Sequence, residues 1–287
     1  MLLNSLCAFF LALCVLSFWI VERRIITVGL YIVSLVLAFL TQRITLIGGG
    51  VLLAFLVGFI LINRPNFSRF LRSLGYLILL AIGMALCMHI APGFSRWELI
   101  TGCKVSPSSA PYSLCFNFDK VSVGIFILLS TPHLISQTTG EWRRSLFCSA
   151  FFTSIAIAIL LIVVWSTGII RWEPKWPAFM PLWLVMNLLF FSVVDEAIFR
   201  GFIQDKLMRL FVSFKWGRML ALLCASVLFA ILYAHLGVFY MVTAFIAGLI
   251  YGGAYIASRR LEASIITHFV INFVHLIGFT YPIFQAK

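Results

Sequence analysis

Ionisable residues are rare in the long apolar runs of this chain, and those that occur gather at three places. One run carries Asp195, Glu196 and Arg200, the next ends at His235, and the last carries His268. A charged side chain inside a membrane costs about 2.5–3.5 kcal/mol on insertion scales, so it normally faces a protein interior or a cavity, where it does chemistry or carries ions. These five residues are therefore candidates for a site within a membrane.

The spacing of these residues predicts which of them share a helix face. Glu196 and Arg200 are four residues apart, so they lie on one face, where the arginine can hold the carboxylate ionised. In the last run, His268, Asn272 and His275 follow i, i+4, i+7 spacing and project from one side of a helix. Two polar stripes on different helices therefore have reason to converge.

The elements that must position these stripes are membrane helices. Of the 287 residues, 63 % are hydrophobic and 10 % are charged, and the mean hydropathy is +1.10. A soluble domain has about 45–50 % apolar and about 25 % charged residues, so a water-soluble globular domain is excluded. The pattern predicts an all-α, polytopic transmembrane helical bundle of about eight to ten spans. The ten predicted spans cover about residues 2–21, 25–42, 44–63, 73–92, 121–137, 145–166, 178–204, 218–237, 239–257 and 262–280.

The positive charge of the chain indicates its orientation and no nucleic-acid partner. The net charge is +12, but the Lys and Arg residues lie in short segments between apolar runs, which is the positive-inside pattern. Thirteen of them fall in the loops after the odd-numbered spans and seven fall on the opposite side. This bias predicts that both termini lie outside and that the odd-numbered loops are cytoplasmic.

One long predicted loop, about residues 93–120, would then face the oxidising side and contains Cys103 and Cys115. That compartment permits a disulfide between them, and two free thiols are an equal alternative. The other five cysteines lie in apolar runs without C-x-x-C spacing and behave as small hydrophobes.

The polar positions also have simpler interpretations. Residues 178–194 already supply a nearly apolar span, so residues 195–209 could instead form an amphipathic helix at the membrane interface, with solvated carboxylates. A histidine near a helix end, such as His89 or His133, is an interfacial residue to which we assign no function, and His235 taken alone would be treated in the same way.

Three segments in the last third of the chain carry the candidate residues. They are Asp195-Glu196-Ala-Ile-Phe-Arg200, Ile231-Leu-Tyr-Ala-His235 and His268-Phe-Val-Ile-Asn272. In the same order they resemble E-E-x-x-x-R, F-x-x-x-H and H-x-x-x-N, the three motifs of the CPBP membrane proteins, the CAAX proteases and bacteriocin-processing enzymes. The resemblance covers about residues 178–280.

Two positions depart from the family pattern. The phenylalanine of the second motif is Ile231, with Phe229 two residues earlier, which is an apolar exchange. The first glutamate of the first motif, usually given the catalytic role in the family, is Asp195, whose carboxylate is set back by about 1.5 Å. A misplacement of about 1 Å can cost about 10²-fold in rate. Either the site is built around the shorter side chain, or Glu196 serves, or the protein has lost activity.

The resemblance implies hydrolysis of a peptide bond inside the membrane, which needs an activated water and an oxyanion stabiliser. Asp195 or Glu196 is the candidate general base, Arg200 would fix that carboxylate, and His235 would orient or share the water. The histidine and asparagine of the third motif would donate hydrogen bonds to the tetrahedral oxyanion.

A metal-dependent alternative uses the same residues. His235, His268 and either Glu196 or Asp195 could hold Zn²⁺ with an open position for water. Both glutamate-based and metal-based mechanisms are proposed for the family, so the cofactor is left open between none and Zn²⁺. At about 1.5 Å per residue from the cytoplasmic helix ends, Glu196 lies about 15 Å deep in the membrane but His235 about 25 Å deep. His235 is therefore included in the site because of its motif, and the estimated depth does not support it.

The sequence therefore predicts an intramembrane endopeptidase of the CPBP kind. Residues 1–177 would be an N-terminal transmembrane module of unknown role, and residues 178–287 the catalytic helical domain. The partners would be the lipid bilayer and a membrane-embedded or lipid-anchored protein substrate, and we expect a multi-pass protein of a bacterial inner membrane. A catalytically inactive CPBP-like binding or bacteriocin-immunity protein is one alternative. A proton-coupled transporter, which also uses buried acids and histidines on facing helices, is another.

Overall fold

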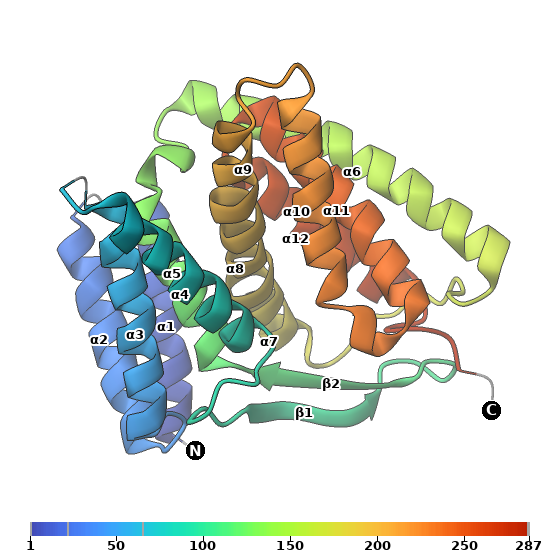
Figure 1. The fold of residues 1–287 in the computed structure, drawn as a ribbon. Helices are drawn as coiled ribbons and strands as arrows, with labels where there is room; N and C mark the ends of the chain where they lie inside the picture. The colour runs from blue at the N-terminus through green and yellow to red at the C-terminus, as the bar shows by residue number, and fades with distance from the viewer. Residues whose placement is uncertain (1, 22, 65, 286–287) are drawn as a thin grey trace. The chain divides into compact units, whose positions relative to one another are not determined.

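The computed structural model describes residues 2–21, 23–64 and 66–285, and most of these residues are helical (Figure 1). Within these residues, seven helices are long and apolar enough to cross a membrane by length and composition, and α2 and α10 are shorter apolar helices. The predicted all-α, polytopic bundle is thereby confirmed. The chain divides into two compact units, the first comprising Met1–Glu98 and Cys115–Ser130, the second Leu99–Leu114 and Thr131–Lys287.

The first unit is built from two helix pairs and one further helix. Its helices are α1 (Leu2–Ile20), α2 (Arg24–Leu40), α3 (Leu46–Asn63), α4 (Arg69–Cys87) and α5 (Phe118–Ser130). Helix α1 packs along α2, and α3 packs along α4. Hydroxyl groups join the first pair, since Ser17 Oγ lies 2.8 Å from Thr27 Oγ1 and Ser34 Oγ donates to the Cys7 carbonyl. Such small polar residues bring apolar helices into close contact.

The predicted span over residues 121–137 is wrong in its length. Helix α5 has 13 residues and ends at Ser130, and the 3₁₀ helix η1 (Pro132–Leu134) follows. The residue before a proline is disfavoured in helical conformation, so Thr131 ends the helix. At about 1.5 Å per residue α5 is about 20 Å long, too short for a hydrocarbon core of about 30 Å. It is instead a buried helix of its unit.

The long region that we predicted as a loop contains a pair of strands, β1 (Trp97–Lys104) and β2 (Pro111–Phe116), which run in opposite directions (Figure 1). The Gly102 N–H donates to Ser113 Oγ across the pair. Cys103 and Cys115 are therefore not opposite one another, and both are free thiols.

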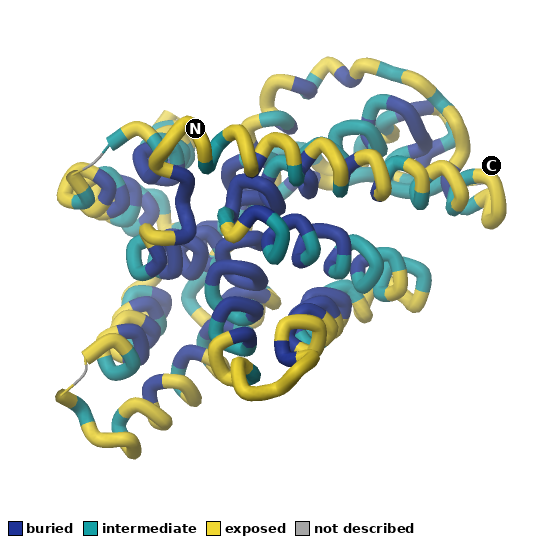
Figure 2. Tube along the Cα trace, turned by 90° about the horizontal axis from the view of Figure 1, so that it is seen from above, coloured by how far each residue is buried: buried dark blue, intermediate teal, exposed yellow. Residues whose placement is uncertain are grey.

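The second unit contains one long helix and four others, of which three pack against the long helix and the fourth packs on two of those three. The long helix runs through α7 (Met180–Val185), η2 (Met186–Ser192), α8 (Val193–Glu196), η3 (Ala197–Gln204) and α9 (Asp205–Leu210). The others are α6 (Thr139–Thr167), α10 (Gly217–Ile231), α11 (Val238–Ser258) and α12 (Leu261–Gly278), with the short 3₁₀ helix η4 (Ala234–Leu236) between α10 and α11. The long helix is the most buried of these helices and forms the centre of the unit. Of an 18-residue apolar stretch in each helix, 72 % is buried in the long helix and 17 % in α6 (Figure 2 colours the chain by burial).

Local capping defines the ends of α6, and a tertiary contact fixes the beginning of α12. Helix α6 begins with a capping box between Thr138 and Glu141 and ends at Gly168 in the left-handed conformation. At the start of α12, the buried Glu262 carboxylate accepts hydrogen bonds from the Ser136 N–H and hydroxyl, each 2.8 Å long. These bonds tie the beginning of α12 to the segment that leads into α6.

The predicted break at residues 172–177 lies in the connection between α6 and α7. Helix α6, on the N-terminal side of this break, packs against α11 and α12 within the second unit. A domain boundary at residue 177 stays a prediction.

Candidate active site

The two carboxylates of the first motif lie at the middle of the long central helix. Asp195 and Glu196 belong to α8, a single α-helical turn between the π-helical segments η2 and η3. Both are buried, so the alternative of an amphipathic interfacial helix over residues 195–209 is wrong. π-helical turns are rare and occur frequently at functional sites.

The Glu196 carboxylate joins the first motif to the third. Its Oε1 lies 2.9 Å from His268 Nδ1, and its Oε2 lies 3.1 Å from Arg200 Nε, an ion pair without the alignment of a hydrogen bond. The side chains of Glu196 and Arg200 have no exposed surface. An unpaired charge in such a place would be very costly, which is the physical reason for the i, i+4 pairing. The predicted convergence of the two polar stripes is thereby confirmed for Glu196 and His268.

Arg200 is held by three further neighbours. Its Nη2 donates a 2.8 Å hydrogen bond to the Gly248 carbonyl on α11, and its guanidinium carbon lies 5.1 Å from the Phe229 ring centre and 5.6 Å from that of Tyr251. Aromatic faces attract a cation at such distances. Gly248 also lets α10 pack closely on α11, because a Cβ there would lie 3.0 Å from Ser226 Cβ on α10.

The orientation of the His268 ring is fixed on two sides. The Tyr251 ring stacks on it with centroids 4.5 Å apart and an interplanar angle of 14°, and the Phe229 ring meets it edge-on at 6.2 Å. Because Nδ1 faces the Glu196 carboxylate, Nδ1 carries the proton and donates. Nε2 is then the ring nitrogen that can meet a substrate.

Asn272 lies one turn beyond His268 on the same side of α12. Its Nδ2 lies 3.4 Å from the side-chain oxygen of Asn187 on η2, and Ser192 Oγ lies at the same distance from that oxygen. Asn187 is buried. The amide of Asn272 is thus positioned by the central helix, as His268 is by Glu196.

Polar bonds also dock the central helix on α11, one turn after another. One helical turn after the bond from Arg200 to Gly248, Gln204 Nε2 donates to the Gly252 carbonyl at 3.1 Å. The Tyr255 hydroxyl donates to Asp205 at 3.0 Å. This ladder holds Tyr251, which lies between its rungs, in place against His268.

Asp195 lies next to Glu196 and is turned by about 100° from it around the helix axis. Its side chain is 3 % exposed, and it lies within electrostatic range of the Tyr233 hydroxyl, which follows α10. The site therefore holds two buried carboxylates that face different neighbours.

His235 is placed differently from the other motif residues. It lies on η4, is exposed to solvent, and is joined to neither Glu196 nor His268 by any bond between described residues. Across the described ranges, no three His, Cys, Asp or Glu side chains lie close enough together to hold a metal ion. The donor set predicted for Zn²⁺ is thus not assembled in this structure. The role of His235 stays a prediction from its motif.

Four residues of this cluster escaped the sequence analysis as site residues: Asn187, Gln204, Phe229 and Tyr251. The polarity of Asn187 and Gln204 within apolar helices is a signal that could have found them. The two aromatic residues carry no such signal, because their type and spacing are those of ordinary core residues.

Comparison with known proteins finds a family that is similar to the part of the chain that holds this cluster. Residues 176–274, about a third of the chain, match a family model described as Rce1-like, type II CAAX prenyl endopeptidase Rce1-like. The matched segment contains all three motifs, so the resemblance to the CPBP proteins is confirmed. The matched family is a protease family, and this match supports an intramembrane peptidase. No curated protein and no solved structure matches the chain.

Proposed function

We propose that this protein hydrolyses a peptide bond in a membrane-embedded or lipid-anchored protein, near the cytoplasmic half of the bilayer, with Asp195 as the general base. The observation that carries this proposal is the buried Glu196 carboxylate between His268 and Arg200. The same contacts support a division of labour between the two adjacent carboxylates.

Glu196 is better suited to positioning than to accepting a proton from water. Its two oxygens face the His268 N–H and the Arg200 guanidinium, so both already have neighbours within this cluster. A buried carboxylate that orients a histidine ring is a recurring arrangement in hydrolases. Asp195, one residue earlier, then receives the proton of the attacking water.

The third motif would stabilise the oxyanion. Water adds to the peptide carbonyl, Asp195 takes its proton, and the carbonyl oxygen becomes negative. His268, through Nε2, and Asn272, through its amide, would donate hydrogen bonds to that oxygen. For His268 to donate at Nε2, its ring must carry a proton on each nitrogen, with the Nδ1 proton donated to Glu196. The intermediate then breaks its C–N bond, and the proton held by Asp195 passes to the leaving amine.

His235 would orient or share the attacking water, and the support for this role is its position in the second motif. Residue Arg200 acts through Glu196 and is a positioning residue.

The test compares the N-termini of membrane proteins, by mass spectrometry, in cells that express the wild type, Asp195→Asn, Glu196→Gln or His268→Ala. We expect N-termini that occur with the wild type and disappear with each of the three variants at equal protein level. Asp205→Asn is the matched control, because Asp205 is also a buried aspartate of the central helix but contacts Arg209 and Tyr255, and asparagine keeps an oxygen that can accept from the Tyr255 hydroxyl. If the N-termini persist in Asp195→Asn, the assignment of the base is wrong. If no N-terminus depends on any site residue, a non-catalytic role replaces this proposal.

A further inference from the structure

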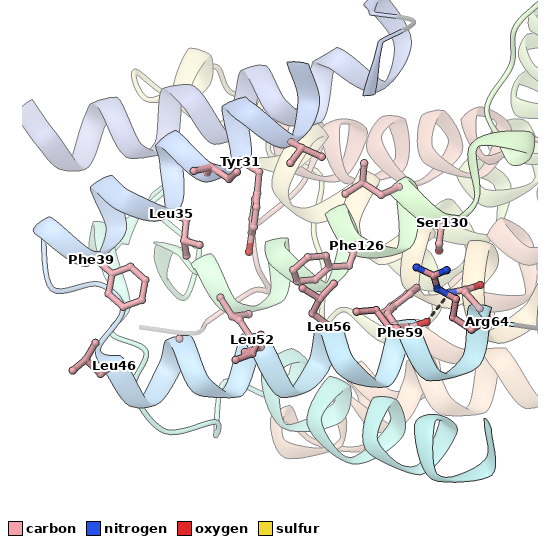
Figure 3. A pocket seen from close by; sticks show the side chains of 17 residues that line it. Tyr31, Leu35, Phe39, Leu46, Leu52, Leu56, Phe59, Arg64, Phe126 and Ser130 are labelled. Atoms are coloured by element: carbon pink, nitrogen blue, oxygen red, sulfur yellow. Dashed lines mark hydrogen bonds between the residues drawn. The ribbon is translucent and has the colours of Figure 1, made fainter. Parts of the chain in front are cut away.

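The first unit contains an elongated apolar cavity that the proposed peptidase chemistry does not use. Although α2 and α3 follow one another, their described residues do not pack together along their lengths, and a cavity of about 990 Å³ lies between them (Figure 3). Apolar side chains of α2 and α3 form its walls, among them Leu35, Phe39, Leu52 and Leu56, and Phe126 of α5 closes the back.

The cavity is apolar even where a polar residue lines it. The Tyr31 hydroxyl bonds to Ser122 Oγ at 2.9 Å, so the ring borders the cavity while the polar atom is satisfied elsewhere. Water has few partners in such a space. An occupant must therefore be apolar along most of its length.

One end of the cavity differs from the rest, since Asn63, Arg64 and Ser130 lie there (Figure 3). The Asn63 amide donates to the Phe59 carbonyl and the Ser130 hydroxyl to that of Ile127. Arg64 takes part in none of the ion pairs between described residues. The cavity thus ends at the Arg64 guanidinium, which forms no ion pair with a carboxylate of the described residues.

The cavity is long and narrow in outline. Its lining follows α3 from Leu46 to Asn63, about 26 Å at 1.5 Å per residue. A flexible hydrocarbon chain can follow such an apolar path.

We propose that this cavity binds an anionic phospholipid of the bilayer, with the phosphate group on Arg64 and an acyl chain along α3. An acyl chain reaches about half of the hydrocarbon thickness, or about 15 Å. Counted from Arg64, that distance extends past Ile60 and Leu56 to Leu53, all of which line the cavity. The charge of Arg64 therefore matches a lipid whose head lies at this end, and its acyl chain would occupy the part of the cavity nearest to Arg64.

The test measures bound lipid by native mass spectrometry of the full-length protein, after exposure to phosphatidylglycerol or phosphatidylcholine with identical acyl chains. We expect the wild type to retain phosphatidylglycerol in preference to phosphatidylcholine. Arg64→Gln should lower phosphatidylglycerol retention by about fivefold, since a basic residue at a membrane surface contributes about 1 kcal/mol. Arg64→Lys should retain most of it. Arg72→Gln, at an exposed arginine outside the cavity, is the control and should have no effect.

A second pair of variants tests the path of the acyl chain. Leu56→Trp fills the cavity about 12 Å from Arg64 and should lower the retention of both lipids, whereas Leu77→Trp, on an exposed position of α4 outside the cavity, should not. Equal retention of the two lipids by the wild type, or an Arg64→Gln protein that binds like the wild type, would overturn the proposal. Unchanged binding in a folded Leu56→Trp protein would do the same.

Discussion

The ion pair between Glu196 and Arg200 should be coupled far more strongly than a second pair on the same helix. Both side chains of this pair have no exposed surface, and their atoms lie 3.1 Å apart. Removing one partner of a buried pair leaves an uncompensated charge and typically costs about 3–5 kcal/mol. We therefore expect Glu196→Gln and Arg200→Met each to lower the free energy of unfolding by about that much. The double variant should lose less than the two together.

The same helix offers a matched comparison. Asp205 and Arg209 also lie four residues apart, with atoms 2.8 Å from each other, but the Arg209 side chain is 60 % exposed. Exposed pairs at this spacing contribute about 0.3–0.5 kcal/mol. The assay is a double-mutant cycle for each pair, with the free energy of unfolding measured by denaturant titration in detergent micelles.

The predicted coupling energy is about 1–3 kcal/mol for Glu196 with Arg200, and at most about 0.5 kcal/mol for Asp205 with Arg209. Additive effects within the first pair would refute the reasoning, because they would mean that the buried charges do not depend on one another.

Three further predictions concern other parts of the second unit and one control position. Tyr251→Phe should keep cleavage close to the wild-type rate, whereas Tyr251→Leu, which removes the ring stacked on His268, should lower kcat about tenfold with a smaller change in KM, as measured by steady-state kinetics. Gly248→Ala should destabilise the protein by about 1–3 kcal/mol through overpacking against α10, while Gly50→Ala, where a Cβ meets nothing within 4 Å, should be neutral or stabilising by about 0.5–1 kcal/mol. Burial lowers the pKa of Lys175, outside the spans, from its ordinary 10.5 to about 8, so the folded protein releases this proton before the unfolded chain does. The free energy of unfolding should therefore rise between about pH 8 and pH 10.5, and Lys175→Met should remove that rise in denaturant titrations.

Several features of the fold could be predicted from the sequence because they depend on local composition. Apolar runs long enough to cross a bilayer identified the helices, and the spacing of Glu196 and Arg200 predicted their pairing. The length of α5 was missed, although Pro132 is a visible signal for its end. The strands β1 and β2 were also missed, because their half-exposed residues alternate without a strong apolar pattern.

The candidate site could be predicted only where a polar residue interrupts an apolar helix. That rule found Glu196 and His268, whose contact is the centre of the cluster. It could not find Tyr251, because stacking on His268 depends on how α11 crosses α12 and not on residue type. The position of His235 also depends on tertiary structure, since the helix that precedes it ends at Ile231.

The central claim is that Asp195 activates the water while Glu196 holds His268 for the oxyanion. The most direct test is single-turnover cleavage of an identified substrate by the purified protein in proteoliposomes. The account predicts that Asp195→Asn lowers the rate by about 10²-fold or more and His268→Ala by about 10²–10³-fold, while Asp205→Asn stays near the wild type. An Asp195→Asn protein that cleaves at the wild-type rate would contradict the account.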